Sequence, residues 1–276
     1  MLKTRVITAL VLVGLLLPSM FLLPQAAWAI LIALFIGVGA WEWGALLGWS
    51  GSARIALGAG FTSSCAALAW IDPAAIGAAG FQPEQAWVLL LYGAAAVFWV
   101  LLMPFWLRSK WALRGGSGLL VGAVVLLPTW LAMVQLRAAS PLLLLAAFAV
   151  AWVADIAAYF AGRRFGRRKL APTISPGKTW EGAVGAVLGV LVYGLVLGHY
   201  FLDGVVALPL WGAALLAVTA VSIVGDLFES LLKRKAGIKD SSNVLPGHGG
   251  VLDRIDSLTS TLPLIALVWL LVIYRG

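Results

Sequence analysis

The chain of 276 residues is 62% hydrophobic and only 11% charged, and its mean hydropathy is +1.02. Ordinary soluble domains have about 25% charged residues, so this composition excludes a soluble domain and predicts an integral membrane protein. A single cysteine, Cys65, excludes a disulfide framework, and with two distant histidines it cannot form a closed zinc site. The net charge of +8 follows the membrane loops, as shown below, and does not indicate nucleic acid.

Nine apolar runs approach or reach the length of about 20 residues that crosses a bilayer. We therefore predict an all-α polytopic protein, one continuous membrane domain with N-terminal helices in 1–135 and a catalytic region in 136–276. The first run ends at an Ala-Trp-Ala site like that of a signal peptide, but a second span follows at once, which favours a retained hairpin. The predicted spans are 6–23, 26–48, 55–71, 86–106, 118–135, 140–160, 182–201, 206–232 and 258–274.

The distribution of Lys and Arg predicts the orientation, since these residues mark cytoplasmic loops. With the N-terminus inside and nine spans, 17 of the 19 Lys and Arg residues are cytoplasmic, and only Arg137 and Arg275 lie outside. Arg114 belongs to the inside set. We therefore expect a cell (inner) membrane protein whose C-terminus lies outside and whose polar segments 162–179 and 226–256 face the cytoplasm.

Apart from the polar stretch that begins at Asp226, two carboxylates fall within predicted spans, where ionisable residues are functional hypotheses by default. Asp155 lies four residues before Tyr159, and its main alternative is a hydrogen bond between helices. Glu42 stands between Trp41 and Trp43 at an expected interface, and there we favour a structural role.

The loop predicted at 162–179 is strongly basic, and attraction to anionic headgroups alone would explain its charge. Its SPGKT sequence is partly similar to a phosphate-binding P-loop, but Pro172 replaces the first glycine and no strand is predicted before it. The sequence therefore does not indicate a P-loop. The basic residues are Arg163, Arg164, Arg167, Arg168 and Lys169.

The stretch 226–256 is the densest polar part of the chain, with ten of its 30 Asp, Glu, Lys and Arg residues. It begins as a helix, because apolar residues take one face and polar residues at i, i+3, i+4, i+7 and i+8 take the other. The polar residues are Asp226, Glu229, Ser230, Lys233 and Arg234.

After this helix, Ser, Asn, Pro and Gly residues predict a loop, in which Gly249 and Gly250 would let backbone amides approach an anion. Asp253 and Asp256 return where the last apolar run begins. Together these features indicate a cradle for metal-bound phosphates. The alternative is a solvated loop with cytoplasmic lysines and helix-capping aspartates.

The segment from Ser230 to Asp256 (SLLKRKAGIKDSSNVLPGHGGVLDRID), here called the signature segment, resembles the phosphatidate cytidylyltransferases, with 14 fixed positions over its 27 residues. The run Asp155–Gly182 also resembles that family, including SPGKTWEG, so the likeness covers about the C-terminal half. The fixed positions are Ser230, Lys233, Arg234, Lys239, Asp240, Ser242, Leu245, Pro246, His248, Gly249, Gly250, Asp253, Arg254 and Asp256.

The resemblance implies an enzyme that joins CTP and phosphatidate to give CDP-diacylglycerol and pyrophosphate. It implies a Mg²⁺ site between Asp226 and Asp253, with room for a second cation. Lys233, Arg234, Lys239 and Arg254 would balance phosphate charge, and Lys178 would contact a phosphate. Orientation of ligands, or support of the residues that touch them, is expected from Asp155, Ser230, Asp240, His248 and Asp256.

Two alternatives remain open at this point. A transporter or flippase would use Glu42, Asp155 and Asp226 as ion sites, although the charges gather at one face of the membrane. A related CTP-using enzyme would act on another lipid, such as a polyprenyl alcohol or an archaeal ether lipid. The expected partners are CTP, phosphatidate and membrane lipid, without nucleic acid, and a homodimer is compatible with the sequence.

Overall fold

A computed structural model describes residues 2–113, 115–201 and 206–274, and in this part of the chain nine helices are long and apolar enough to cross a membrane. The all-α membrane architecture expected from composition is confirmed. The orientation assignments of Arg114 and Arg275 lie outside the described residues.

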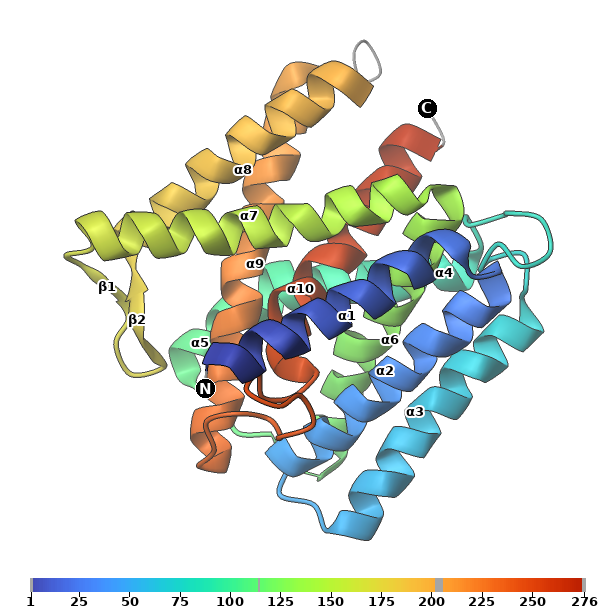
Figure 1. Cartoon of the computed structure of the whole chain (residues 1–276), viewed down its shortest axis with the longest axis horizontal. Helices are drawn as coiled ribbons and strands as arrows, with labels where there is room; N and C mark the ends of the chain where they lie inside the picture. Colours follow the sequence, from blue (N-terminus) through green and yellow to red (C-terminus); the bar gives the residue numbers. More distant parts are fainter. Residues whose placement is uncertain (1, 114, 202–205, 275–276) are drawn as a thin grey trace.

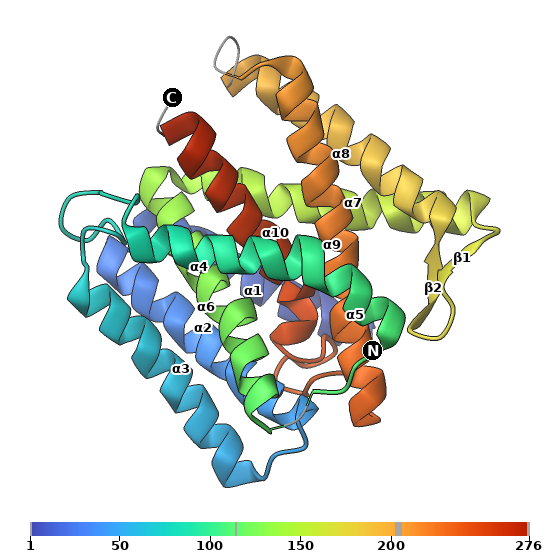
Figure 2. The same cartoon turned by 180° about the vertical axis from the view of Figure 1, so that it is seen from behind.

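The helices follow the predicted order, with several boundaries shifted (Figures 1 and 2). The fourth span consists of α4 (Ala86–Ala96), a π-helical turn (Val97–Leu102) and α5 (Met103–Ser109), and the last is α10 (Leu252–Val268) continued by a π-helical turn (Trp269–Tyr274). The others are α1 (Leu2–Leu22), α2 (Gln25–Leu46), α3 (Gly51–Ile71), α6 (Gly115–Ala139), α7 (Pro141–Phe165), α8 (Trp180–Phe201) and α9 (Leu208–Ala236).

The segment predicted as a plain loop after the sixth span contains an antiparallel hairpin, β1 (Lys169–Ala171) and β2 (Ser175–Thr179). The expectation that no strand precedes SPGKT is therefore wrong, and SPGKT itself forms β2. The hairpin is fixed to the helices at both ends, because Glu181 accepts hydrogen bonds from the Arg167 and Arg168 amides and the Thr179 hydroxyl accepts one from the Gly182 amide. This antiparallel pairing differs from the parallel strand-loop-helix unit of a P-loop.

The most buried helix, α6, packs against α2, α4, α7 and α10. Trp130 of α6 and Trp28 of α2 are fully buried, and each indole N–H donates to a backbone carbonyl of the other helix, at 3.0 and 3.2 Å. Trp28 belongs to the Ala-Trp-Ala site considered above, so that site lies inside a packed helix. The N-terminal helices thus form the core against which the polar C-terminal segment folds.

Small residues bring α7 and α8 close together, as expected for packing between membrane helices. A methyl group added at Gly185 would lie 2.3 Å from the Ala161 Cβ, and one at Gly189 would lie 2.7 Å from the Ala157 Cβ. In both views α8 and the first half of α9 project from the rest of the molecule, whereas α7 runs across the bundle (Figures 1 and 2). The close approach positions Asp155 of α7 beside the hairpin that precedes α8.

The first helix, α1, lies across the outside of the bundle, and the rest of the protein buries little of its surface (Figure 1). Near its C-terminal end the buried Arg137 side chain donates to the Met20 carbonyl at 2.9 Å and to the Leu23 carbonyl. Near its N-terminal end the Thr8 hydroxyl donates to the Pro246 carbonyl at 2.9 Å. Arg137, predicted to lie in an outer loop, therefore joins the first two helices to α6.

The helix ends separate into two groups. The start of α1, the β-hairpin and the last turns of α5 and α9 lie to the left and bottom of Figure 1, whereas the α1–α2 and α3–α4 connections lie at the right and α10 runs towards the top. The hairpin and the ends of α5 and α9, which carry most of the basic residues, therefore belong to one group, whereas Arg137 lies by the α1–α2 connection in the other.

Candidate active site

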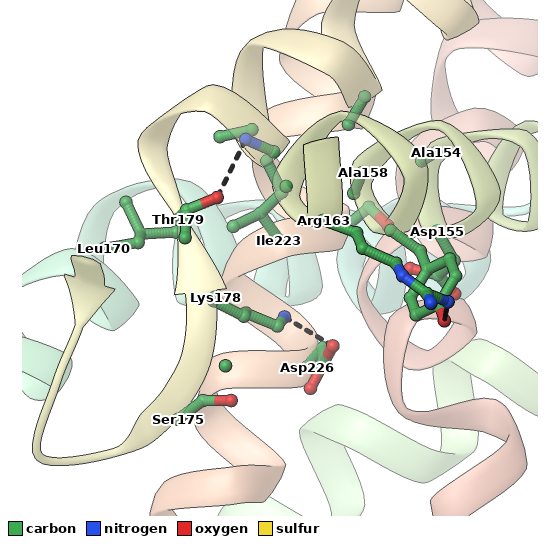
Figure 3. A pocket seen from close by; sticks show the side chains of 17 residues that line it. Ala154, Asp155, Ala158, Arg163, Leu170, Ser175, Lys178, Thr179, Ile223 and Asp226 are labelled. Carbon is green, nitrogen blue, oxygen red and sulfur yellow. Dashed lines mark hydrogen bonds and ion pairs between the residues drawn. The ribbon is translucent and has the colours of Figure 1, made fainter. Parts of the chain in front are cut away.

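A cavity of about 500 Å³ lies between α7, the hairpin, α8 and α9 (Figure 3). Small residues of α7 and α8 form part of its wall, and polar side chains of α7, β2 and α9 project into it. The polar and charged lining residues are Asp155, Tyr159, Arg163, Ser175, Lys178, Thr179, Ser222 and Asp226.

Asp226 is the acidic centre of this cavity. Its carboxylate forms an ion pair with the Lys178 ammonium group across the gap between α9 and β2, and about a quarter of each side chain is exposed (Figure 3). The Ser230 hydroxyl, one turn later on α9, donates to the other Asp226 oxygen over 3.3 Å. Because that bond is long and Asp226 is accessible, its carboxylate can accept further ligands.

Two more predicted aspartates lie within electrostatic range of Asp226. Asp155 of α7 interacts with Asp226, Lys178 and Arg254, and Asp256 of α10 interacts with both of the other aspartates. Three acidic groups and two cations from four separate elements are thus close enough to influence one another electrostatically. The sequence predicted each of these residues, but only the fold places Asp155 beside Asp226.

A second polar cluster lies between α9 and the start of α10, and it is closed. Lys233 is held between two carboxylates, 2.6 Å from an Asp253 oxygen and 3.0 Å from a Glu229 oxygen. The other Asp253 oxygen accepts hydrogen bonds from the Ser241 amide (2.8 Å), the Ser241 hydroxyl (2.9 Å) and the Gly250 amide (2.8 Å). Both Asp253 oxygens are therefore occupied by donors of this chain.

Residues 237–251, the part of the signature segment between α9 and α10, are here called the signature loop, and glycines shape it. Gly237 ends α9 in the left-handed conformation (φ 71°), the usual way for a glycine to terminate a helix. Gly247 and Gly249 also have positive φ, and the Leu245 amide and Gly249 carbonyl close the turn with a 2.9 Å hydrogen bond. The predicted loop is confirmed, and it returns the chain to α10 at Leu252.

The other predicted site residues lie at the edges of these clusters. Arg234 donates to the Ile174 carbonyl of the hairpin at 3.4 Å, and the side chain of Lys239 is exposed. Asp240 lines a separate groove with Trp41 and Arg54. The Nδ1 atom of His248 is buried and has no hydrogen-bond partner among the described residues.

Two residues, Arg163 and Glu229, were given too little weight in the sequence analysis. Arg163, which we assigned to a basic loop, lies on the last turn of α7, lines the cavity and donates to the Tyr159 hydroxyl at 2.9 Å. Glu229, recognised only as part of a polar face, is buried against Lys233. For Arg163, its helical spacing of eight residues from Asp155 was the available signal, since such residues share a face.

These features define a polytopic membrane protein with an acidic and basic cavity at the end of the bundle where basic residues gather, a site suited to a phosphorylated ligand. A model described as the cytidylyltransferase family matches residues 3–272, and the chain belongs to this family. The phosphatidate cytidylyltransferase of Pseudomonas aeruginosa is 45% identical, with 98% of this chain and 97% of that protein covered. The Haemophilus influenzae protein of that name is 36% identical, with 95% and 96% covered. That of Brucella suis is 50% identical over 123 residues, 44% of each chain.

Proposed function

We propose that this protein is a phosphatidate cytidylyltransferase, which forms CDP-diacylglycerol and pyrophosphate from CTP and phosphatidate. The observation that supports this most directly is the cavity at Asp226, where acidic and basic groups face one another beside an apolar wall. Membership of the cytidylyltransferase family and the names of its full-length relatives agree with this assignment.

The cavity suits a lipid that bears a phosphate. Its apolar wall, which includes Ala154, Ala158 and Ile223, would receive the start of the acyl chains, while Lys178 and Arg163 would bind the headgroup. Removing a two-chain lipid from the bilayer costs about 0.8 kcal/mol per methylene, so the enzyme must meet its substrate at the membrane surface. We propose that phosphatidate enters the cavity laterally from the bilayer, and CTP from the aqueous side.

The reaction exchanges one phosphoanhydride bond for another. A phosphate oxygen of phosphatidate attacks the α-phosphorus of CTP, the bond from that phosphorus to the α–β bridging oxygen breaks, and pyrophosphate leaves with the electron pair. The lipid phosphate is largely ionised at neutral pH, so the step needs no general base. Positioning and charge compensation by Lys178, Arg163 and Arg254 would therefore supply most of the catalysis.

A magnesium ion would supply further charge compensation and polarise the phosphates when bound. Among the described residues no three His, Cys, Asp or Glu side chains are placed to hold a metal ion together. One or two carboxylates with substrate phosphate oxygens are sufficient for Mg²⁺, and the accessible Asp226 fits that requirement. A role for Asp253 as the second ligand stays a prediction, and it would require Asp253 to exchange Lys233 or a loop donor. The second cation also stays a prediction.

The location and orientation belong to the same proposal. We place the protein in the inner membrane with the cavity and signature segment facing the cytoplasm, because the basic helix ends gather there. Cytoplasmic CTP would then reach the site directly. A cysteine introduced at exposed Asn243, in a Cys65→Ala background, should react with an impermeant maleimide only when the cytoplasmic side is open.

The test of function is an assay with purified protein, labelled CTP, Mg²⁺ and phosphatidate. We expect a labelled lipid and one pyrophosphate per lipid formed. CTP consumption only with a polyprenyl alcohol or an ether lipid would indicate the related enzyme instead. Ion or lipid flux without CTP consumption would indicate the transporter, and either result would refute the proposal.

A further inference from the structure

A buried carboxylate in the N-terminal half lies against the signature loop. Glu42 of α2 is fully buried, and no Lys, Arg or His in the described part of the chain forms a salt bridge with it. A buried carboxylate without a cation needs several hydrogen bonds to offset the loss of hydration.

The donors to Glu42 all come from the signature loop and the first turn of α10. One oxygen accepts from the Ser242 hydroxyl at 2.5 Å and the Val251 amide at 2.9 Å. The other accepts from the Leu252 amide at 2.7 Å and the Ser241 hydroxyl at 3.1 Å. Glu42 therefore satisfies amides at the N-terminus of α10 that no carbonyl within that helix can reach, and its charge faces the positive end of the helix dipole.

The loop is shaped to let this carboxylate approach. A methyl group at Gly250 would lie 2.3 Å from a Glu42 oxygen and 2.0 Å from the Ser241 hydroxyl oxygen. Glycine at this position thus leaves the space that Glu42 and Ser241 occupy. The requirement for glycine at position 250 is explained by a residue more than 200 positions earlier in the chain.

Ser241 connects Glu42 to the closed cluster around Asp253. Its hydroxyl oxygen lies 3.1 Å from a Glu42 oxygen and 2.9 Å from an Asp253 oxygen, so the hydroxyl bridges the two carboxylates and donates its single proton to one of them at a time. Asp253 in turn contacts Lys233 at 2.6 Å. A displacement of Glu42 would therefore move the loop, Asp253 and Lys233 together.

We infer that Glu42 is a positioning residue for the reaction, which holds the signature loop and the start of α10 in register with α9. This inference rests on the proposed function and adds to it a residue from outside the signature segment. Glu42 does not contact the cavity at Asp226, so its effect reaches the reaction through Asp253 and Lys233. Loss of such a supporting partner typically costs about 10- to 100-fold in activity.

The test compares Glu42→Gln with Gln135→Ala, a matched control. Gln135 is also fully buried and hydrogen-bonded, to Tyr92, Ala75 and Pro83, far from the signature loop. For Glu42→Gln we expect kcat for cytidylyl transfer to fall about 10- to 100-fold, with the KM values for CTP and phosphatidate within about threefold of the parent. The folded fraction of Gln135→Ala should keep the parental kcat.

A second measurement reports the loop itself. A nitroxide attached to Asn243→Cys, in a Cys65→Ala background, should be restrained in the parent and in Gln135→Ala and mobile in Glu42→Gln. This arm remains informative if the parent does not use CTP and phosphatidate, a result that would refute the proposed function alone. Should Glu42→Gln fail to fold, Ser241→Ala with Ser242→Ala removes two of its donors and takes its place. Parental kcat, a label as restrained as in the parent, or an equal kcat loss in Gln135→Ala would overturn the inference.

Discussion

Asp226 and Asp253 stand on adjacent helices of one site, yet their surroundings are opposite. Asp226 is partly exposed in a cavity and its partners are Lys178 and a weakly bonded Ser230. Asp253 is buried and receives four hydrogen bonds from the chain itself. The difference indicates that the Asp226 carboxylate is available to ligands, whereas the Asp253 carboxylate organises the signature loop. The same side chain thus has two different roles, which its surroundings determine.

The largest effect that follows from this comparison is expected for Asp253→Ala. It would leave Lys233 beside Glu229 alone and remove the acceptor for two loop amides, so we expect no measurable turnover and a loss of about 3–5 kcal/mol in the free energy of unfolding. Thermal unfolding in detergent, followed by intrinsic fluorescence, measures the second quantity. Parental stability of this variant would contradict the structural role of Asp253.

Replacement of Lys178 by alanine should lower activity strongly with little change in stability. Lys178 is a partly exposed cation on the cavity wall, and loss of one group that stabilises phosphate charge costs about 100-fold in kcat/KM. The matched control is Lys169→Ala on the other strand of the same hairpin, where the side chain is exposed and outside the cavity lining. Equal losses in the two variants would show that the hairpin contributes only general positive charge.

Gly250→Ala should disturb the cluster around Asp253 and Lys233 and leave the cavity at Asp226 unchanged. The added methyl group would overlap Ser241 and Glu42, and overpacking of this kind costs about 1–3 kcal/mol in stability. Gly60→Ala, where a methyl group would meet no atom within 4 Å, provides the control and should not destabilise the protein. Unfolding midpoints of the two variants decide the matter, and equal midpoints would refute the steric explanation.

The smallest effect is expected for Ser230→Ala. Its hydrogen bond to Asp226 is 3.3 Å long and joins two residues of the same helix, so its removal should cost less than about 1 kcal/mol. We expect the initial rate to fall less than about fivefold. A loss as large as that of Lys178→Ala would mean that Ser230 contacts the substrate directly.

The sequence predicted the helices well because membrane spans are set by length and hydropathy, which are local properties. It also predicted the helical face that begins at Asp226 and the loop after Lys239. The strands β1 and β2 escaped prediction because they are short and are held by Glu181, whose partners Arg167 and Arg168 a local pattern does not reveal.

The site was predicted as a set of residues but not as two clusters. Nothing in the spacing of Asp226 and Asp253 says that one is solvated and the other saturated, since this depends on Lys178, Ser241 and the turn at Gly250. A structural role was favoured for Glu42, but the partners that it holds could not be predicted, for the same reason. Its partners are about 200 residues away along the chain, and its flanking tryptophans indicated an ordinary interface.

The most direct test of the account is the rate of labelled-lipid formation by purified Asp226→Ala, measured beside its thermal unfolding. Because Asp226 is partly exposed and its carboxylate is open to ligands, we expect no labelled lipid from a protein that unfolds at the parental temperature. A well-folded Asp226→Ala enzyme that forms CDP-diacylglycerol at the parental rate would contradict the assignment of this cavity as the catalytic site.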